Sequence, residues 1–448
     1  MAYTPQTWAD SPATSSPISA ANLNHMEDGI AGNLAYRPLT SRTLSYSNGG
    51  QNSSLSSYLS VTRTVTGTSF SIRVPIRLPA NTTSYTIKLR NYNTFSAAAG
   101  ATALTLDGIV MGAMAAPSVG TTGQTGNFSG STATTLVSTS ATIPADGTFY
   151  TSPSITASGA QFTDGGDYIL GIAFHAAAST TLLAGIGQCW YWNNNTSAIN
   201  PATAASTATS AAQYIPLDVI VEYQVSNRKR AFLVVGDSIP EGTTGQAYGI
   251  TALANAGGTG TSSITATPLH RGYVEQWARK RGDMMVQRHC LFASTAQTWA
   301  NASYTGWTRQ STGSAAFDGA ILTLGINDLA GGTTFANLQT YYASCLTNIR
   351  SIIGTSAPIY ATNITPETFT ATQGSTTTPE YYRRQFNDWL AQLPYGLAGV
   401  VDLESAMRPL AASSSGVNGL DYFLMSDGVH PSYQGVTKLT DALMAAIP

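Results

Sequence analysis

From residue 230 onward, short apolar runs alternate with amphipathic segments of helical length. The first run, 231–235, is apolar throughout, which is typical of a strand buried on both faces of a sheet. Further strands are predicted at 284–291, 319–324, 358–362 and 399–403, and helices at 271–281, 335–353, 380–393 and 435–447. Strands that alternate with helices predict a parallel sheet with helices on both of its faces.

The preceding stretch, 36–228, has the pattern of a separate all-β module. Short alternating runs at 70–74, 85–89, 103–106, 134–142, 168–174 and 217–223 are separated by Gly, Asn, Pro and Ser. We expect an antiparallel β-sandwich or jelly roll, with a loop at the Ala/Thr/Ser-rich stretch 196–212.

Residues 1–35 form a third unit, with a short predicted helix. Leu23, Met26 and Ile30 follow helical spacing, and Ser19 is a suitable N-cap. One short helix cannot bury such a stripe alone, so it must pack on the next domain or on copies of itself. The string N-L-N-H-M-E-D-G-I (22–30) resembles the N-terminal segments of phage tail and tail-fibre proteins.

Composition narrows the classes of function. The net charge is -2 and only 10% of the residues are charged, without a basic run, which disfavours nucleic-acid binding. No apolar run is long enough for a membrane helix, and the N-terminus lacks the features of a signal peptide. The three cysteines and the histidines outside the C-terminal motif have no metal-ligand spacing, so we predict no metal and no cofactor.

Three short motifs in the second half carry the chemistry. They are G-D-S at 236–238, G-I-N-D at 325–328 and D-G-V-H at 427–430. Each falls after a predicted strand or just before a helix, at the sheet edge where active sites of such folds form. A serine, an amide, and a histidine three residues after a carboxylate are together the groups needed for acyl transfer.

With these motifs, residues 229–448 resemble the SGNH, or GDSL-type, hydrolases, which have a flavodoxin-like α/β/α fold. The resemblance implies that Ser238 is the nucleophile, His430 the general base and Asp427 the group that orients His430. It also implies that the side chain of Asn327 and the backbone N–H of Ser238 donate to the oxyanion.

One departure from that family concerns the oxyanion hole. The family usually has a glycine after the second strand whose backbone N–H completes the hole, but 292–298 contain none. Ala296 is the best match, because Gln297 and Thr298 resemble the residues that follow that glycine. Trp299, Tyr304 and Trp307 follow on the same predicted edge, where they either stack on sugar rings of a substrate or pack as ordinary core.

The sequence therefore predicts a phage tail-associated serine esterase that removes O-acetyl or similar ester groups from host surface polysaccharide. The expected partners are that polysaccharide, other phage tail proteins and copies of the chain itself, as a homotrimer in the virion. An alternative is a catalytically silent receptor-binding protein on the same scaffold. A secreted bacterial lipase is disfavoured, because no signal peptide or disulfide pair is evident.

Overall fold

The computed structural model of the 448-residue chain describes its residues in separate ranges. These are 42–47, 62–65, 69–76, 78, 80–93, 98–100, 102–115, 127–131, 133–158, 161–163, 166, 168–178, 180–183, 185–194, 210–215, 217–226, 230–241, 272–281, 284–291, 293–307, 317–366, 379–407, 429–431 and 433–448. The predicted helix in 1–35 and the domain boundaries at 35/36 and 228/229 lie outside them, so they stay predictions.

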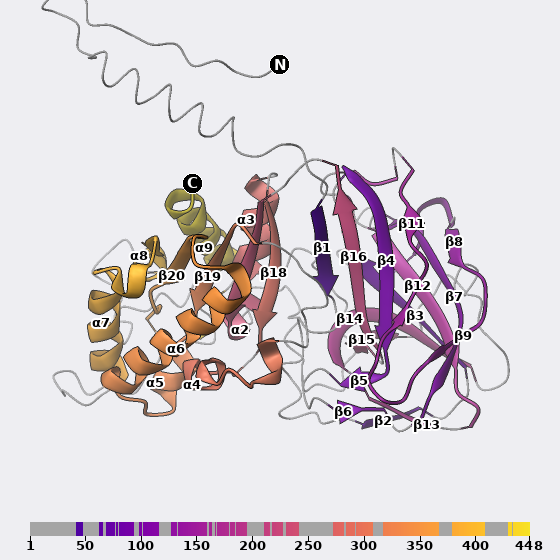
Figure 1. Cartoon of the computed structure of the whole chain (residues 1–448), viewed down its shortest axis with the longest axis horizontal. Helices are drawn as coiled ribbons and strands as arrows, with labels where there is room; N and C mark the ends of the chain where they lie inside the picture. Colours follow the sequence, from indigo (N-terminus) through magenta and orange to yellow (C-terminus); the bar gives the residue numbers. More distant parts are fainter. Residues whose placement is uncertain are drawn as a thin grey trace, which may run out of the picture.

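Two antiparallel sheets make up the first part of the chain (Figure 1). The smaller follows the order β1 (Arg42–Ser47), β16 (Asp218–Val225), β4 (Thr82–Arg90) and β10 (Tyr150–Thr151), with β11 (Ile155–Thr156) also paired to β4. The larger follows the order β15 (Ser210–Ile215), β14 (Gly185–Asn194), β3 (Ser69–Ile76), β12 (Tyr168–His175), β7 (Leu104–Ala113) and β8 (Thr134–Val137), with β9 (Ala141–Ile143) on β7. Two short pairs accompany them: β2 (Thr62–Val65) with β13 (Thr180–Leu183), and β5 (Tyr92–Asn93) with β6 (Ala98–Ala99).

These strands form because their apolar residues alternate along the chain. Tyr85, Ile87 and Leu89 of β4 and Ile72 and Val74 of β3 are buried in one core between the two sheets. Each such side chain contributes about 1.5–3 kcal/mol by leaving water. The predicted antiparallel pairing is confirmed, while the assignment as a jelly roll stays a prediction.

Two details of the predicted β-module are wrong. The run 134–142 is two strands, β8 and β9, because a polar Ser-Thr-Ser turn at 138–140 interrupts it. The predicted loop 196–212 includes the first residues of β15, which pairs with β14. Its Ala and Ser residues gave no apolar alternation from which a strand could be recognised.

The second part of the chain has a parallel sheet, as predicted. The order is β18 (Met284–Cys290), β17 (Arg230–Gly236), β19 (Gly319–Thr323), β20 (Ile359–Thr362) and β21 (Gly399–Val401). The chain leaves β17 for β18 on one side and returns to β19 on the other. In such sheets a crevice opens at this switch point, at the carboxyl ends of the strands.

Helices cover this sheet in two groups. Right-handed crossovers place α4 (Ala296–Ala300), α6 (Phe335–Ile353) and α7 (Pro379–Leu390) on one face and α3 (Gly272–Arg281) on the other. The last helix, α9 (Tyr433–Ala446), packs against α3. The short helices α2 (Ser238–Glu241), α5 (Ile326–Ala330) and α8 (Leu403–Met407) follow β17, β19 and β21 directly, at the sheet's carboxyl edge.

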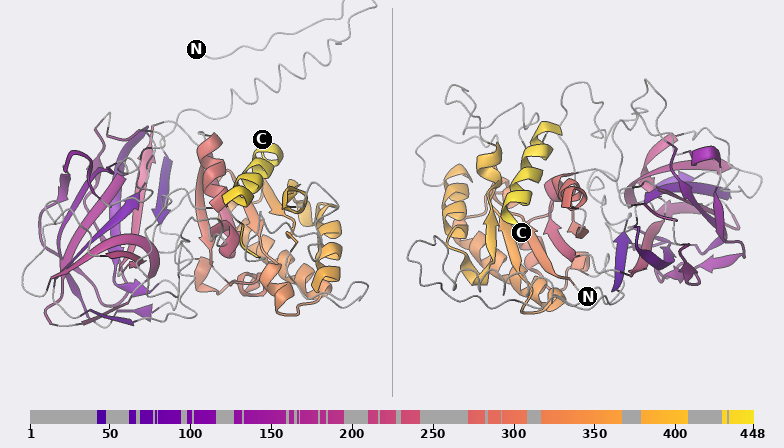
Figure 2. Two further views of the ribbon diagram at one scale, coloured as in Figure 1. Left: turned by 180° about the vertical axis from the view of Figure 1, so that it is seen from behind. Right: turned by 90° about the horizontal axis from the view of Figure 1, so that it is seen from above.

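The β-rich part and the α/β part lie side by side, and the views from behind and from above keep them apart (Figure 2). The edge strand β1 faces the α/β part and lies near β18 (Figure 1). Within the described ranges, no helix combines the length and the apolar character that a membrane span requires.

Candidate active site

Ser238 is the first residue of α2, immediately after the end of β17. Gly236 makes this sharp strand-to-helix connection, because a Cβ there would lie 2.3 Å from Pro240 Cγ and 2.8 Å from the carbonyl oxygen of Thr323. A side chain at 236 would therefore push β17 away from β19. As the first helical residue, Ser238 has a backbone N–H without a partner inside the helix.

His430 reaches Ser238 from the segment just before α9. The Oγ of Ser238 lies 2.9 Å from Nε2 of His430, although 192 positions separate the two residues in the chain. Ser238 is buried and His430 is half-buried. At this distance the imidazole can accept the hydroxyl proton. Asp427, predicted to orient His430, lies outside the described residues.

Asn327 lies at the start of α5, on the neighbouring strand-to-helix connection. Gly325 has φ 120°, and a Cβ there would lie 2.6 Å from Ile364 Cδ1, so only glycine suits this turn. The Nδ2 of Asn327 donates to the carbonyl oxygen of Ser294 at 3.0 Å. Because an amide nitrogen carries two hydrogens, one N–H remains for an oxyanion.

The predicted role of Ala296 in the oxyanion hole is wrong. Its backbone N–H donates to Oδ2 of Asp328 at 2.7 Å, and the N–H of Gln297 donates to Oδ1 of the same carboxylate at 3.2 Å. Asp328 thus holds the first turn of α4. A backbone N–H that already donates to a buried carboxylate is not available to stabilise an oxyanion.

Ala293 lies on the same loop after β18 and has a glycine-like backbone conformation. Its φ is 54°, in the left-handed region where glycine is favoured. Two bonds to the carbonyl oxygen of Gly236, from Leu291 N–H at 3.0 Å and Ser294 Oγ at 3.2 Å, hold Ala293 beside the end of β17. Its own N–H makes no hydrogen bond within the described part of the chain.

The three aromatic residues for which substrate contact and core packing were both open lie against one another. Trp299 is fully buried, and its Nε1 donates to Ser294 Oγ at 2.8 Å. The rings of Tyr304 and Trp307 lie edge-on to it, with centroids at 5.0 and 4.9 Å. Trp307 is also buried and Tyr304 is half-buried. The core alternative therefore holds for Trp299 and Trp307, whose rings cannot stack on a sugar.

Sequence reasoning missed Asp237, the middle residue of the G-D-S motif. Its side chain is 2% exposed, and burial raises its pKa from 3.8 to about 7. The N–H of Ile239, which donates to Oδ1 at 3.0 Å, and the charge of His430 both oppose that rise in pKa. The G-D-S motif contains this residue, but Asp is common in turns, so the sequence did not predict that its carboxyl is buried.

Asp328 is the second missed carboxylate. It is buried, and burial raises its pKa, an effect that its hydrogen bonds from Ala296 and Gln297 counteract. Its carboxylate accepts from two backbone N–H groups at the start of α4, so it positions the loop after β18. Its position as the last residue of the G-I-N-D motif was the only sequence feature that indicated a role for it.

The remaining histidines form no metal cluster in the described ranges, where no group of three or more His, Cys, Asp and Glu side chains gathers. His175 is bound to Asp107, with Nδ1 2.8 Å from Oδ1, and is half-exposed. His289 is buried with Nε2 3.1 Å from Nε2 of Gln287.

The α/β part of the chain matches a known protein family. Residues 234–438, somewhat less than half of the chain, match the model of the GDSL-like lipase/acylhydrolase family. That match spans Ser238, Asn327 and His430, and it supports a hydrolytic esterase for this domain. No curated protein sequence matches the chain.

Three solved structures show a distant likeness. A lipolytic G-D-S-L family member from Veillonella parvula DSM 2008 has 14% identity and a TM-score of 0.34, covering 48% of this chain and 97% of that one. An acetylxylan esterase from Geobacillus stearothermophilus has 17% identity and a TM-score of 0.33, covering 49% and 94%. A family two carbohydrate esterase from Clostridium thermocellum has 11% identity and a TM-score of 0.34, covering 90% and 97%. At these values the likenesses carry no conclusion about function.

Proposed function

We propose that the C-terminal domain is a serine esterase in which Ser238 and His430 act as nucleophile and base. The 2.9 Å contact between Ser238 Oγ and His430 Nε2 carries this proposal. Two residues 192 positions apart that meet as hydroxyl and imidazole supply the pair that covalent acyl transfer requires.

The reaction proceeds in two halves. Ser238 Oγ attacks the ester carbonyl while its proton passes to His430 Nε2. The tetrahedral intermediate collapses to an acyl-serine, and His430 returns the proton to the leaving alcohol. Water then attacks the acyl-serine with His430 again as base, which releases the acid and restores the hydroxyl. Asp427 holds His430 in the tautomer whose free nitrogen faces Ser238.

The oxyanion of each intermediate is stabilised by three donors. We assign them to the free N–H of the Asn327 side chain and to the backbone N–H groups of Ser238 and Ala293. Ala293 replaces Ala296 in this role, because only its N–H is unengaged and its backbone has the glycine-like conformation. A fixed donor at the developing charge lowers the barrier by about 3–4 kcal/mol.

The biological setting is a further part of the proposal. The N-terminal string N-L-N-H-M-E-D-G-I favours a phage tail protein, and the substrate would then be an O-acetyl or similar ester on host surface polysaccharide. The expected assembly is a homotrimer in the virion that contacts other tail proteins. The buried Trp299 and Trp307 no longer support the polysaccharide, so this part rests on the N-terminal resemblance alone.

Hydrolysis of p-nitrophenyl acetate and longer p-nitrophenyl esters tests the chemistry. Ser238→Ala and His430→Ala should each lower turnover by a factor on the order of 10⁴ or more, since the pair acts as a unit. Ser351→Ala, which changes an exposed serine on α6, is the matched control and should keep the activity of the parent protein. Circular dichroism establishes that each variant is folded.

The same assay distinguishes the esterase from the alternative, a catalytically silent receptor-binding scaffold. A folded parent protein without turnover on any of these esters would favour that scaffold. Turnover that survives in Ser238→Ala would place the activity elsewhere in the chain.

A further inference from the structure

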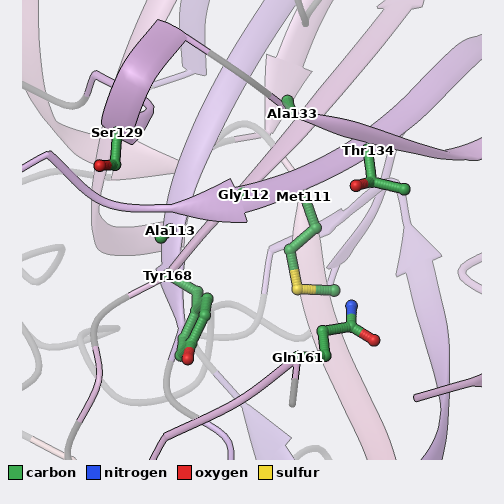
Figure 3. Close-up of a pocket in the computed structure, with 8 residues that line it drawn as sticks. All are labelled: Met111, Gly112, Ala113, Ser129, Ala133, Thr134, Gln161 and Tyr168. Carbon is green, nitrogen blue, oxygen red and sulfur yellow. The ribbon is translucent and has the colours of Figure 1, made fainter. Parts of the chain in front are cut away.

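A cavity of about 400 Å³ opens in the β-rich part, outside the esterase domain (Figure 3). It lies where the end of β7, the start of β8, the start of β12 and the short turn Ser129–Ser131 come together. The lining residues are Met111, Gly112, Ala113, Ser129, Ala133, Thr134, Gln161 and Tyr168. Its volume falls within the range of small-molecule sites, about 300–1,000 Å³.

The lining contains neutral polar groups and apolar groups. Polar atoms come from the hydroxyls of Ser129, Thr134 and Tyr168 and from the amide of Gln161, whereas Met111 and two alanines supply apolar surface. Among the residues that the structure describes, the lining includes no Asp, Glu, Lys, Arg or His. An ionic ligand would lose hydration here without gaining a counter-charge, so the lining favours an uncharged, polar ligand.

Two of the polar groups are held in place by the protein itself. Gln161 donates through Nε2 to the hydroxyl of Tyr85 at 2.9 Å, and its Oε1 accepts from Ser158 N–H at 3.3 Å. The hydroxyl of Tyr168 accepts from Thr163 N–H at 2.7 Å. Polar groups that are fixed before binding lose little conformational entropy when a ligand arrives.

Aromatic packing around Phe162 connects Gln161 and Tyr168 to the core. Phe162 lies edge-on between Tyr85 and Tyr168, with ring centroids at 5.6 and 5.0 Å. Gln161 adjoins Phe162 and uses only one of its two amide hydrogens on Tyr85, so the second can reach a ligand. The arrangement is a rigid site with spare hydrogen-bonding capacity.

We propose that this cavity binds one unit of an uncharged saccharide. A neutral sugar ring carries hydroxyls around its rim and C–H groups on its faces, which match the amide and hydroxyls and the apolar surface of Met111 and the alanines. The site is independent of the proposed esterase: it would hold the chain on a glycan whether or not Ser238 is active.

The test uses unesterified sugars, so that hydrolysis plays no part. Glucose, galactose, mannose, N-acetylglucosamine and disaccharides built from them are titrated against the full chain, with binding followed by saturation-transfer NMR. Glucuronic acid and glucosamine are the charged counterparts. At least one neutral sugar should bind with Kd of about 10 mM or tighter, and the charged analogues about tenfold more weakly.

Two tryptophan substitutions locate the bound sugar. Thr134→Trp places a large ring at the cavity, whereas Thr135→Trp is the matched control, since adjacent strand residues point to opposite faces. Both threonines are exposed, so both variants should fold. Thr134→Trp should weaken binding about tenfold or more, and Thr135→Trp by less than about twofold.

Three results would overturn the proposal. They are no binding by any neutral sugar, equal binding of the charged analogues, and binding that Thr134→Trp leaves unchanged. The last would place the sugar elsewhere, including the esterase site. A lack of ester hydrolysis has no bearing on this test, so failure of one proposal is distinguishable from failure of the other.

Discussion

The buried carboxyl of Asp237 should make the stability of this protein depend on pH in a way that one substitution removes. Burial raises its pKa from 3.8 to about 7, so the folded state binds this proton more tightly than the unfolded chain does. Protonation of Asp237 therefore stabilises the fold. That contribution is complete below pH 3.8 and is lost as the pH rises through about 7.

The size of the effect follows from the two pKa values. Each pKa unit corresponds to about 1.4 kcal/mol, so the full shift amounts to about 4 kcal/mol, of which about 3 kcal/mol is lost between pH 5 and pH 8. Asp237→Asn is the suitable change, because the amide oxygen can still accept the N–H of Ile239 while the side chain cannot ionise. The unfolding free energy of the variant should lack the pH-dependent contribution that Asp237 makes in the parent protein.

Urea denaturation of both proteins at pH 5 and pH 8 measures the effect. The difference in unfolding free energy, variant minus parent, should be about 3 kcal/mol larger at pH 8 than at pH 5. His430 and Asp328 interact with Asp237, and both remain in the variant, so the comparison isolates the carboxyl of Asp237. A difference that is the same at both pH values would show that Asp237 is ionised in the fold and would refute the reasoning.

Three further outcomes are expected. Asn327→Ala should lower kcat by roughly 10²–10³ with little change in KM, because one oxyanion donor is lost; steady-state kinetics with p-nitrophenyl acetate would contradict this by showing an unchanged kcat. Ala293→Gly should keep the activity and raise the unfolding free energy by about 0.5–1 kcal/mol, because it relieves the left-handed strain; destabilisation in urea would count against the assigned backbone geometry. Light scattering should find a trimer for the full chain and a monomer for a chain that starts at Arg37, since the apolar stripe of 1–35 needs a partner; a monomeric full chain would exclude this assembly.

Much of the α/β fold could be predicted because its signals are local. The apolar run at 231–235 and the helical pattern at 335–353 correspond to β17 and α6, whose N-cap Thr334 accepts from Asn337 N–H. Parallel strands end at one edge, so the G-D-S and G-I-N-D motifs had to lie near each other. The β-module was harder to predict, since weakly apolar strands such as β15 form only through pairing with their neighbours.

The sequence by itself determined which chemical groups the site contains and at which sheet edge they gather, because motif order and strand-to-helix turns are properties of adjacent residues. Only the tertiary structure decided which groups are free to act. The amide of Ala296 is engaged by Asp328, and Trp299 is buried against Ser294. Asp237 titrates near neutral pH because the surrounding core excludes water. The hydrogen bonds of a backbone N–H, the burial of a side chain and the pKa of a carboxyl depend on contacts between residues far apart in the chain. No local pattern could therefore reveal them.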